Sequence, residues 1–153
     1  MNKIEQVKTL LESGYNCGQA IMAAFAGECG ISRELALKIS LNLGGGCAFR
    51  GEICGAVSAT LLIYGIKFGT DRPNDELNEE IVYHHSSEYV REFTSIHGSI
   101  RCRELLGHDL SNPDGFARIM EDGLFKLKCS RFVLDSARIL EQKLNETNKR
   151  IGL

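Results

Sequence analysis

The sequence contains no tryptophan and only two prolines in 153 residues. Because proline breaks helix interiors, so few prolines favour a mostly helical chain. An excess of basic residues is also lacking, since 18 Lys and Arg stand against 20 Asp and Glu for a net charge of −2. With no surplus of positive charge to neutralise phosphates, we expect no nucleic-acid partner.

Long hydrophobic runs are absent from the sequence as well. The longest uncharged stretches, residues 13–27 and 53–66, contain 15 and 14 residues, which is short of the roughly 18 that indicate a membrane span. The first twelve residues are polar and amphipathic, without the apolar centre of a secretory signal. We therefore expect a cytoplasmic protein with no membrane span. Its length corresponds to about one domain, so residues 1–153 are expected to form a single domain.

Helical periodicity dominates the chain, and no alternation typical of strands is present. We therefore expect an all-α, single-domain multi-helix bundle. The segment 53–68 is apolar on most sides and is expected to be a buried central helix. In the third helix, Leu35, Ile39 and Leu43 are expected on the buried side, and the tail from about residue 145 is expected to fray. Cap residues and glycines place the helices at residues 4–13, 16–28, 32–43, 53–68, 75–97, 99–106, 112–121 and from 130 onward.

The six cysteines are the unusual feature of the composition. They contain no CxxC pair, which argues against a zinc ribbon or a thioredoxin motif, and no CxxCH for covalent haem attachment. In a compartment that keeps thiols reduced, six cysteines favour metal ligands or redox groups over static crosslinks. They are Cys17, Cys29, Cys47, Cys54, Cys102 and Cys129.

Four of these cysteines, Cys17, Cys54, Cys102 and Cys129, fall at expected helix starts. Unpaired N–H groups and the helix dipole at such positions favour the thiolate over the thiol. Basic residues surround two of them and act in the same direction. We therefore predict that at least two of the four titrate below the free thiol pKa of about 8.5, and that the four sulfurs gather at one end of the bundle. The surrounding basic residues are Arg101, Arg103, Lys126, Lys128 and Arg131.

Several short motifs around these cysteines resemble the family of redox-active proteins named for the signature C_GCAxxG_C_C. The four signature cysteines of that family correspond to Cys17, Cys54, Cys102 and Cys129. The sixth position of its Cys-Gly-Ala-x-x-Gly motif is Ala59 here, and Cys29 and Cys47 are extra to the signature. The matching stretches are 14–20, 44–46, 51–58, 102–107 and 123–129.

The resemblance implies redox chemistry without naming a reaction. A similar domain occurs in split-Soret-type cytochromes, which carry haems and an iron–sulfur centre. Since this chain lacks haem attachment motifs, only the cluster carries over. The leading hypothesis is therefore that Cys17, Cys54, Cys102 and Cys129 ligate an iron–sulfur cluster for electron transfer.

Other interpretations of the same four cysteines stay open. One is a metal-free thiol–disulfide oxidoreductase or redox sensor, and another is a structural zinc site. A redox partner protein is expected if the cysteines bind a cluster or exchange disulfides. Whether the chain forms a homo-oligomer stays open. Two further residues are weighed as supports: Arg50 as a partner of an anionic centre, and His97 as an additional ligand.

Overall fold

The computed structural model describes residues 1–150 and 152, and within them the fold is all-α, as expected. A 3-10 turn (Leu41–Leu43) follows the third helix, and a π-helical turn (Phe125–Cys129) leads into the last one. The α-helices in chain order are α1 (Lys3–Glu12), α2 (Cys17–Ala24), α3 (Arg33–Ile39), α4 (Gly55–Phe68), α5 (Glu76–His97), α6 (Cys102–Leu106), α7 (Pro113–Glu121) and α8 (Ser130–Arg150).

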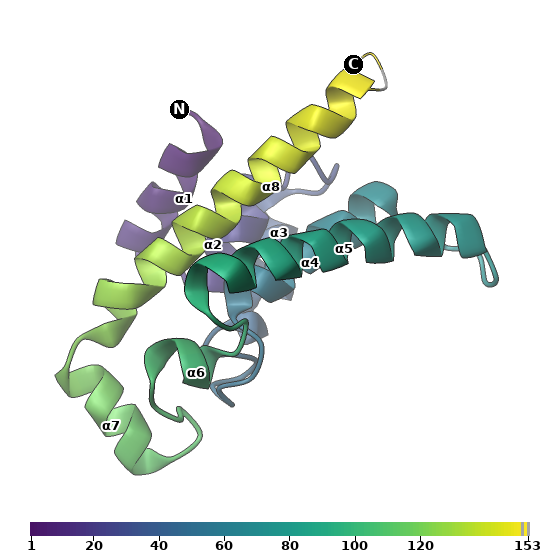
Figure 1. The fold of residues 1–153 in the computed structure, drawn as a ribbon. Coiled ribbons are helices and arrows are strands. Elements are labelled where there is room, and N and C mark those ends of the chain that lie inside the picture. Colours follow the sequence, from purple (N-terminus) through teal and green to yellow (C-terminus); the bar gives the residue numbers. More distant parts are fainter. Residues whose placement is uncertain (151, 153) are drawn as a thin grey trace.

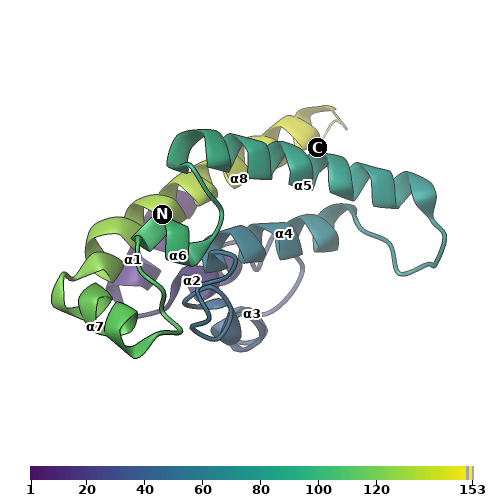
Figure 2. The same cartoon turned by 60° about the horizontal axis from the view of Figure 1, so that its bottom comes forward.

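Helix α4 lies at the centre of the bundle and packs against α2, α5 and α8 (Figures 1 and 2). Most of its residues are buried, which confirms the expected buried central helix. Helices α4 and α5 run side by side as a hairpin (Figure 2), and α1 packs against α2 and α8. The largest side chains without exposed surface, Tyr64, Tyr89, Phe25 and Phe93, fill the space between these helices.

A second, smaller apolar cluster forms around α6 and α7, which lie together at one end of the molecule (Figures 1 and 2). Cys102 and Leu106 from α6 pack there with Ile119 from α7, and Cys129 covers the cluster from the start of the last helix. Two of the four signature cysteines therefore belong to this cluster, whereas Cys54 belongs to the main core.

Local capping explains several helix starts that the sequence predicts. The Asn16 side chain accepts a hydrogen bond from the Gln19 N–H at 3.0 Å, and the Gln19 side chain accepts one from the Asn16 N–H at 3.2 Å. This reciprocal capping satisfies two unpaired N–H groups at the start of α2. Ser32 caps α3 through the Leu35 N–H, and Asn112 caps α7 ahead of Pro113.

Other expectations about the helices are wrong or incomplete. Helix α2 ends at Ala24 rather than near residue 28. In α3, Leu35 and Ile39 are 46% and 48% exposed, and Ala36 is the buried residue. In this seven-residue helix, contacts with neighbouring elements decide which residue is buried, and the apolar stripe of the helix does not. None of the helices in the described residues has the length and apolar character needed to span a membrane.

The start and the end of α8 also differ from expectation. Ser130 does not cap the helix, because the chain is already helical through the π turn, and its hydroxyl bonds back to the Lys126 carbonyl. At the other end, α8 is helical to Arg150, past the point where fraying is expected. Leu144 is buried in the main core and anchors this end. Residues 151 and 153 of the expected frayed tail lie outside the described residues.

Candidate functional site

The four signature cysteines come from four separate parts of the chain. Cys17 is the first residue of α2, Cys54 directly precedes α4, and Cys102 is the first residue of α6. Cys129 is the last residue of the π turn that leads into α8. All four thiols are free, and Cys54 and Cys102 are buried.

A short backbone bridge joins the two segments that contain Cys54 and Cys102. Ile53 and Arg101 pair as an isolated antiparallel β-bridge. The Cys54 N–H donates to the Ile100 carbonyl at 2.8 Å, and the Cys102 N–H donates to the Glu52 carbonyl at 2.6 Å. Because each cysteine follows its bridge residue, the bridge aligns the starts of α4 and α6. Nothing in the predicted helices indicates this pairing.

Glu52 strengthens the bridge with its side chain. Its carboxylate forms an ion pair with Arg101 at 2.8 Å and a second one with Arg103, which also lies 3.5 Å from Asp109. Arg101 and Arg103 were expected to stabilise a Cys102 thiolate. Instead, both form ion pairs with Glu52, and neither arginine is among the causes that shift the pKa of Cys102. The signal that could have shown this is the carboxylate two residues before Cys54, opposite in sign to the arginines that flank Cys102.

The glycine-rich loop between α3 and α4 lies against the same residues. Five consecutive residues, 45–49, have positive φ, and three of them are not glycine. At Gly46, where φ is +71°, an added Cβ would lie 2.7 Å from the Cys102 Cβ and 2.6 Å from the Glu52 nitrogen. Glycine is required there both for its conformation and for its lack of a side chain.

Backbone groups surround the sulfur of Cys17. An added Cβ on Gly55 would lie only 2.5 Å from the Cys17 Sγ, so the start of α4 touches this thiol directly. A hydrogen bond from the Cys54 thiol lowers the pKa of Cys17 most, and backbone N–H groups of Gly18, Gly45 and Gly55 lower it further. They outweigh burial, and the pKa of Cys17 falls to about 7. The Cys54 thiol and, after it, backbone groups from α2, the glycine-rich loop and α4 therefore favour the thiolate of Cys17.

The other three signature cysteines are shifted in the opposite direction. The hydrogen bond to Cys17 raises the pKa of Cys54 well above its usual value, and burial adds to this. Burial and then the charge of Cys17 raise the pKa values of Cys102 and Cys129 to about 12. The prediction of at least two low values is therefore wrong, because desolvation of a buried thiolate exceeds the effect of a helix start. Lys128 opposes the shift at Cys129 only in part.

These mutual effects define how the thiols are grouped. Cys17 influences the pKa of Cys54, Cys102 and Cys129, and Cys102 influences Cys54 and Cys129. Cys17 thus lies within electrostatic reach of the other three signature thiols, and Cys102 lies within reach of Cys54 and Cys129. Among the described residues, no three His, Cys, Asp or Glu side chains already converge on one position suited to a single metal ion.

The two remaining cysteines lie apart from this group. Cys29 is half-buried after α2, where burial raises its pKa and the nearby charges are Lys67, Glu28 and Lys3. Cys47 is exposed on the glycine-rich loop. Neither is among the causes that shift the pKa values of the four signature cysteines.

Within the part of the chain that the structure describes, neither His97 nor Arg50 bonds to any of the four thiols. The His97 imidazole is only 3% exposed, and its Nε2 lies 3.3 Å from the Asp135 carboxylate. Its ring packs between Phe93 and Phe132. Arg50 contributes its backbone carbonyl, which accepts a hydrogen bond from the Arg103 guanidinium at 2.8 Å. His97 therefore serves the packing of α5 against α8.

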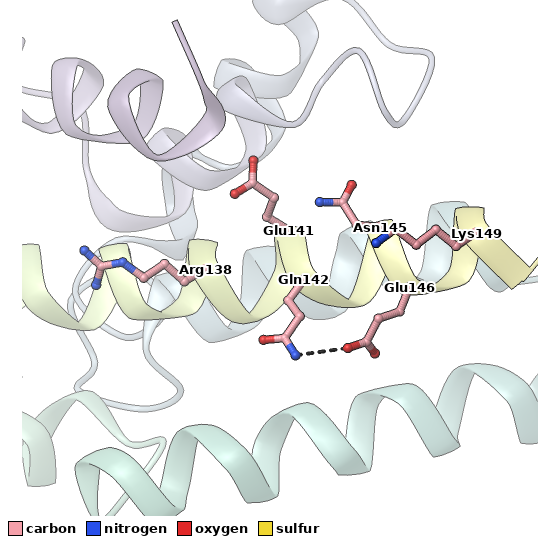
Figure 3. A pocket seen from close by; sticks show the side chains of 6 residues that line it. All are labelled: Arg138, Glu141, Gln142, Asn145, Glu146 and Lys149. Carbon is pink, nitrogen blue, oxygen red and sulfur yellow. Dashed lines mark hydrogen bonds between the residues drawn. The ribbon is translucent and has the colours of Figure 1, made fainter.

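Two surface depressions contain none of the cysteines. One, of about 380 Å³, lies along the outer side of α8, where the Gln142 amide bonds to Glu146 at 3.0 Å (Figure 3). The other, of about 610 Å³, lies between α5 and α8 around His84 and His85. Both depressions are lined only by residues of α5 and α8, and none of the four signature cysteines is among them.

The fold and the site define an all-α protein with several free thiols that influence one another. A family model described as "Putative redox-active protein (C_GCAxxG_C_C)" matches residues 15–143, which include all four signature cysteines. The chain belongs to this family, and the match confirms the resemblance seen in its motifs. No curated protein and no solved structure gives a significant match.

Proposed function

We propose that Cys17, Cys54, Cys102 and Cys129 bind an iron–sulfur cluster and that the protein transfers electrons through it. The observation that carries this proposal is that Cys17 influences the pKa of the other three signature thiols, although the four come from separate parts of the chain. Cysteine thiolates are the usual ligands of iron–sulfur clusters. The family is described as redox-active. Since zinc has no redox chemistry, that description favours a cluster over a zinc site.

The surroundings of the thiols support an anionic group. Backbone N–H groups of Gly18, Gly45 and Gly55 point to the Cys17 sulfur, and hydrogen bonds to cluster sulfurs are one means by which proteins set cluster potentials. Gly46 and Gly55 lack the Cβ atoms that would collide with Cys102 and Cys17. The glycines therefore leave the thiols closely enclosed by backbone.

When bound, such a cluster supplies one-electron transfer at a potential set by its ligands and surroundings. The residues of this chain would contribute in three ways. The four cysteines provide the ligand sulfurs, the glycine N–H groups stabilise negative charge on Cys17, and the apolar cluster around Leu106 and Ile119 shields Cys102 from water. Electron transfer also requires a donor and an acceptor, so we propose a redox partner protein. Because the thiols must stay reduced, we place the protein in the cytoplasm.

The experiment is metal and sulfide analysis of anaerobically purified protein, with its visible spectrum. We expect iron and sulfide together with broad visible charge-transfer absorption. Cys54→Ser and Cys102→Ser should strongly reduce the bound iron, since each removes one thiolate ligand. Cys29→Ser and Cys47→Ser are the matched controls and should retain it. Stoichiometric zinc without iron, or iron lost equally in the control variants, would contradict the proposal.

One observation favours a second function, namely thiol–disulfide exchange. The interaction between the Cys17 and Cys54 thiols lowers the pKa of Cys17 and raises the pKa of Cys54. A thiolate beside a protonated thiol is the arrangement in which one cysteine attacks a disulfide and the other resolves the mixed disulfide. This function needs only Cys17 and Cys54. Disulfide reductase activity that survives in the Cys102→Ser and Cys129→Ser variants would support it over the cluster.

A further inference from the structure

Three buried hydroxyl groups form a hydrogen-bonded cluster inside the bundle, below the start of α4. The Tyr89 hydroxyl lies 2.7 Å from the Ser136 hydroxyl, and the Thr60 hydroxyl lies 3.0 Å from it. Ser136 also donates to the Ala56 carbonyl at 3.3 Å. Tyr89, Ser136 and Thr60 have no exposed surface. They come from α5, α8 and α4, so the cluster joins three helices.

The direction of each hydrogen bond follows from counting protons. A carbonyl can only accept, so the single hydroxyl hydrogen of Ser136 is used on Ala56. Tyr89 and Thr60 must then both donate to the Ser136 oxygen. Ser136 is therefore the central member, which accepts two hydrogen bonds and passes one to the first turn of α4. Removing it would leave two buried donors without a partner, which is costly.

The end point of this cluster is close to the thiols. Ala56 lies two residues after Cys54, in the first turn of the same helix. On its other side, Cys54 is held by its N–H bond to the Ile100 carbonyl. The residue is thus fixed from the bridge side and, through Ala56, from the hydroxyl cluster. Cys54 is buried in the main core, and Cys17 packs against the same core.

We propose that Tyr89, Ser136 and Thr60 are positioning residues of the redox centre, which hold the start of α4 so that Cys54 keeps its contact with Cys17. This inference rests on the role of Cys54 in the proposed redox centre. It assigns a function to a polar group in the middle of an otherwise apolar core, where buried hydroxyl groups would have no advantage over apolar side chains of the same shape.

The test uses the metal-free protein and a glutathione buffer. Oxidised glutathione takes two electrons from the Cys17–Cys54 dithiol, so the protein gains a disulfide and two molecules of reduced glutathione form. Peptide mapping by mass spectrometry measures the equilibrium constant. We expect Tyr89→Phe and Ser136→Ala to lower it by at least about threefold, or about 14 mV for a two-electron couple. Thr60→Ser keeps the hydroxyl group and should preserve the wild-type value.

Tyr64→Phe is the matched control for Tyr89→Phe. Tyr64 is equally buried, and its hydroxyl has no hydrogen-bond partner among the described residues. The control should therefore leave the equilibrium constant unchanged. Thermal unfolding of every variant shows whether it folds. If Ser136→Ala does not fold, Tyr89→Phe decides the result.

A wild-type equilibrium constant in folded Tyr89→Phe and Ser136→Ala, with only a lower unfolding temperature, would overturn the positioning role. An equal change in Tyr64→Phe would overturn it as well. The iron–sulfur proposal is decided separately by metal analysis. If the purified protein contains no iron, that proposal fails, while the thiol–disulfide comparison still decides whether these hydroxyl groups position Cys54.

Discussion

The Cys17 thiol is the residue whose ionisation the fold changes most directly near neutral pH. Its folded pKa of about 7 lies below its usual value. A pKa lowered on folding stabilises the folded state above the unfolded pKa of about 8.5, and this stabilisation is lost as the pH falls through 7. Because the other three signature thiols begin to ionise in the unfolded chain as the pH approaches 8.5, we expect the free energy of unfolding of the reduced, metal-free protein to rise by about 1 kcal/mol or less between pH 6.5 and 8.

Urea unfolding at a series of pH values measures this dependence. Above about pH 8 the trend should reverse, because the raised pKa values of Cys54, Cys102 and Cys129 favour unfolding once their thiols ionise in the unfolded chain. Cys17→Ser should abolish the rise below about pH 8 and keep the fall above it. A rise of equal size in Cys17→Ser would assign the effect to another group.

Gly55 shows how strictly a single residue limits the site. An added Cβ would lie 2.5 Å from the Cys17 Sγ and 2.7 Å from the Leu43 carbonyl oxygen. Gly55→Ala is therefore expected to displace Cys17 and to lower the free energy of unfolding by about 1–3 kcal/mol. The alkylation rate of Cys17, followed by mass spectrometry against pH, should show a raised pKa, since the Gly55 N–H no longer lies beside the sulfur.

Gly65, in the same helix, is the matched control. An added Cβ there would meet nothing within 4 Å. Because alanine favours a helix interior over glycine, Gly65→Ala should stabilise the protein by up to about 1 kcal/mol and leave the Cys17 titration unchanged. Equal behaviour of the two variants would show that Gly55 does not shape the Cys17 environment.

At the scale of elements, the end of α8 tests why the chain stays helical beyond residue 145. Leu144 is buried in the main core, whereas Leu127, in the π turn before α8, is 73% exposed. Leu144→Ala should lower the free energy of unfolding by about 2–5 kcal/mol. Leu127→Ala should lower it by less than about 0.5 kcal/mol. Amide hydrogen exchange should show protection through residue 147 in the wild type and its loss in Leu144→Ala. Rapid exchange from residue 145 in the wild type would instead support fraying.

Helix boundaries could be predicted where the deciding contacts are local. The Asn16 and Ser32 caps and the Asn112-Pro113 start depend on neighbouring backbone groups only. The predicted cap at Ser130 is wrong because the preceding turn is already helical. The predicted buried face of α3 is wrong because contacts with other elements bury Ala36 instead. The Ile53–Arg101 bridge joins residues 48 positions apart, so no local pattern could indicate it.

For the whole molecule, the ionisation of the four thiols predicts proton release on metal binding. At pH 7 Cys17 is about half ionised, and the other three signature thiols are protonated. Since thiolates are the binding form, loading all four with Cd²⁺ as a probe should release about three to four protons, and affinity should rise with pH.

Calorimetry in buffers of different ionisation enthalpy measures this number under anaerobic conditions. Cys102→Ser should release about one proton fewer than the wild type, and Cys29→Ser should match the wild type. Release of about one proton or fewer from the wild-type protein would mean that the four thiols do not bind the metal together.

The sequence by itself determined the all-α class, the central helix and the family. These depend on periodicity, on cap residues and on the spacing of cysteine motifs, which are all properties of the chain order. It also singled out Cys17, Cys54, Cys102 and Cys129 by their expected positions at helix starts. Only the tertiary structure decided how their charge states differ, because the pKa of a thiol depends on burial and on neighbours distant in sequence. The backbone of α4 and the glycine loop stabilise a thiolate at Cys17, whereas burial keeps Cys54, Cys102 and Cys129 protonated.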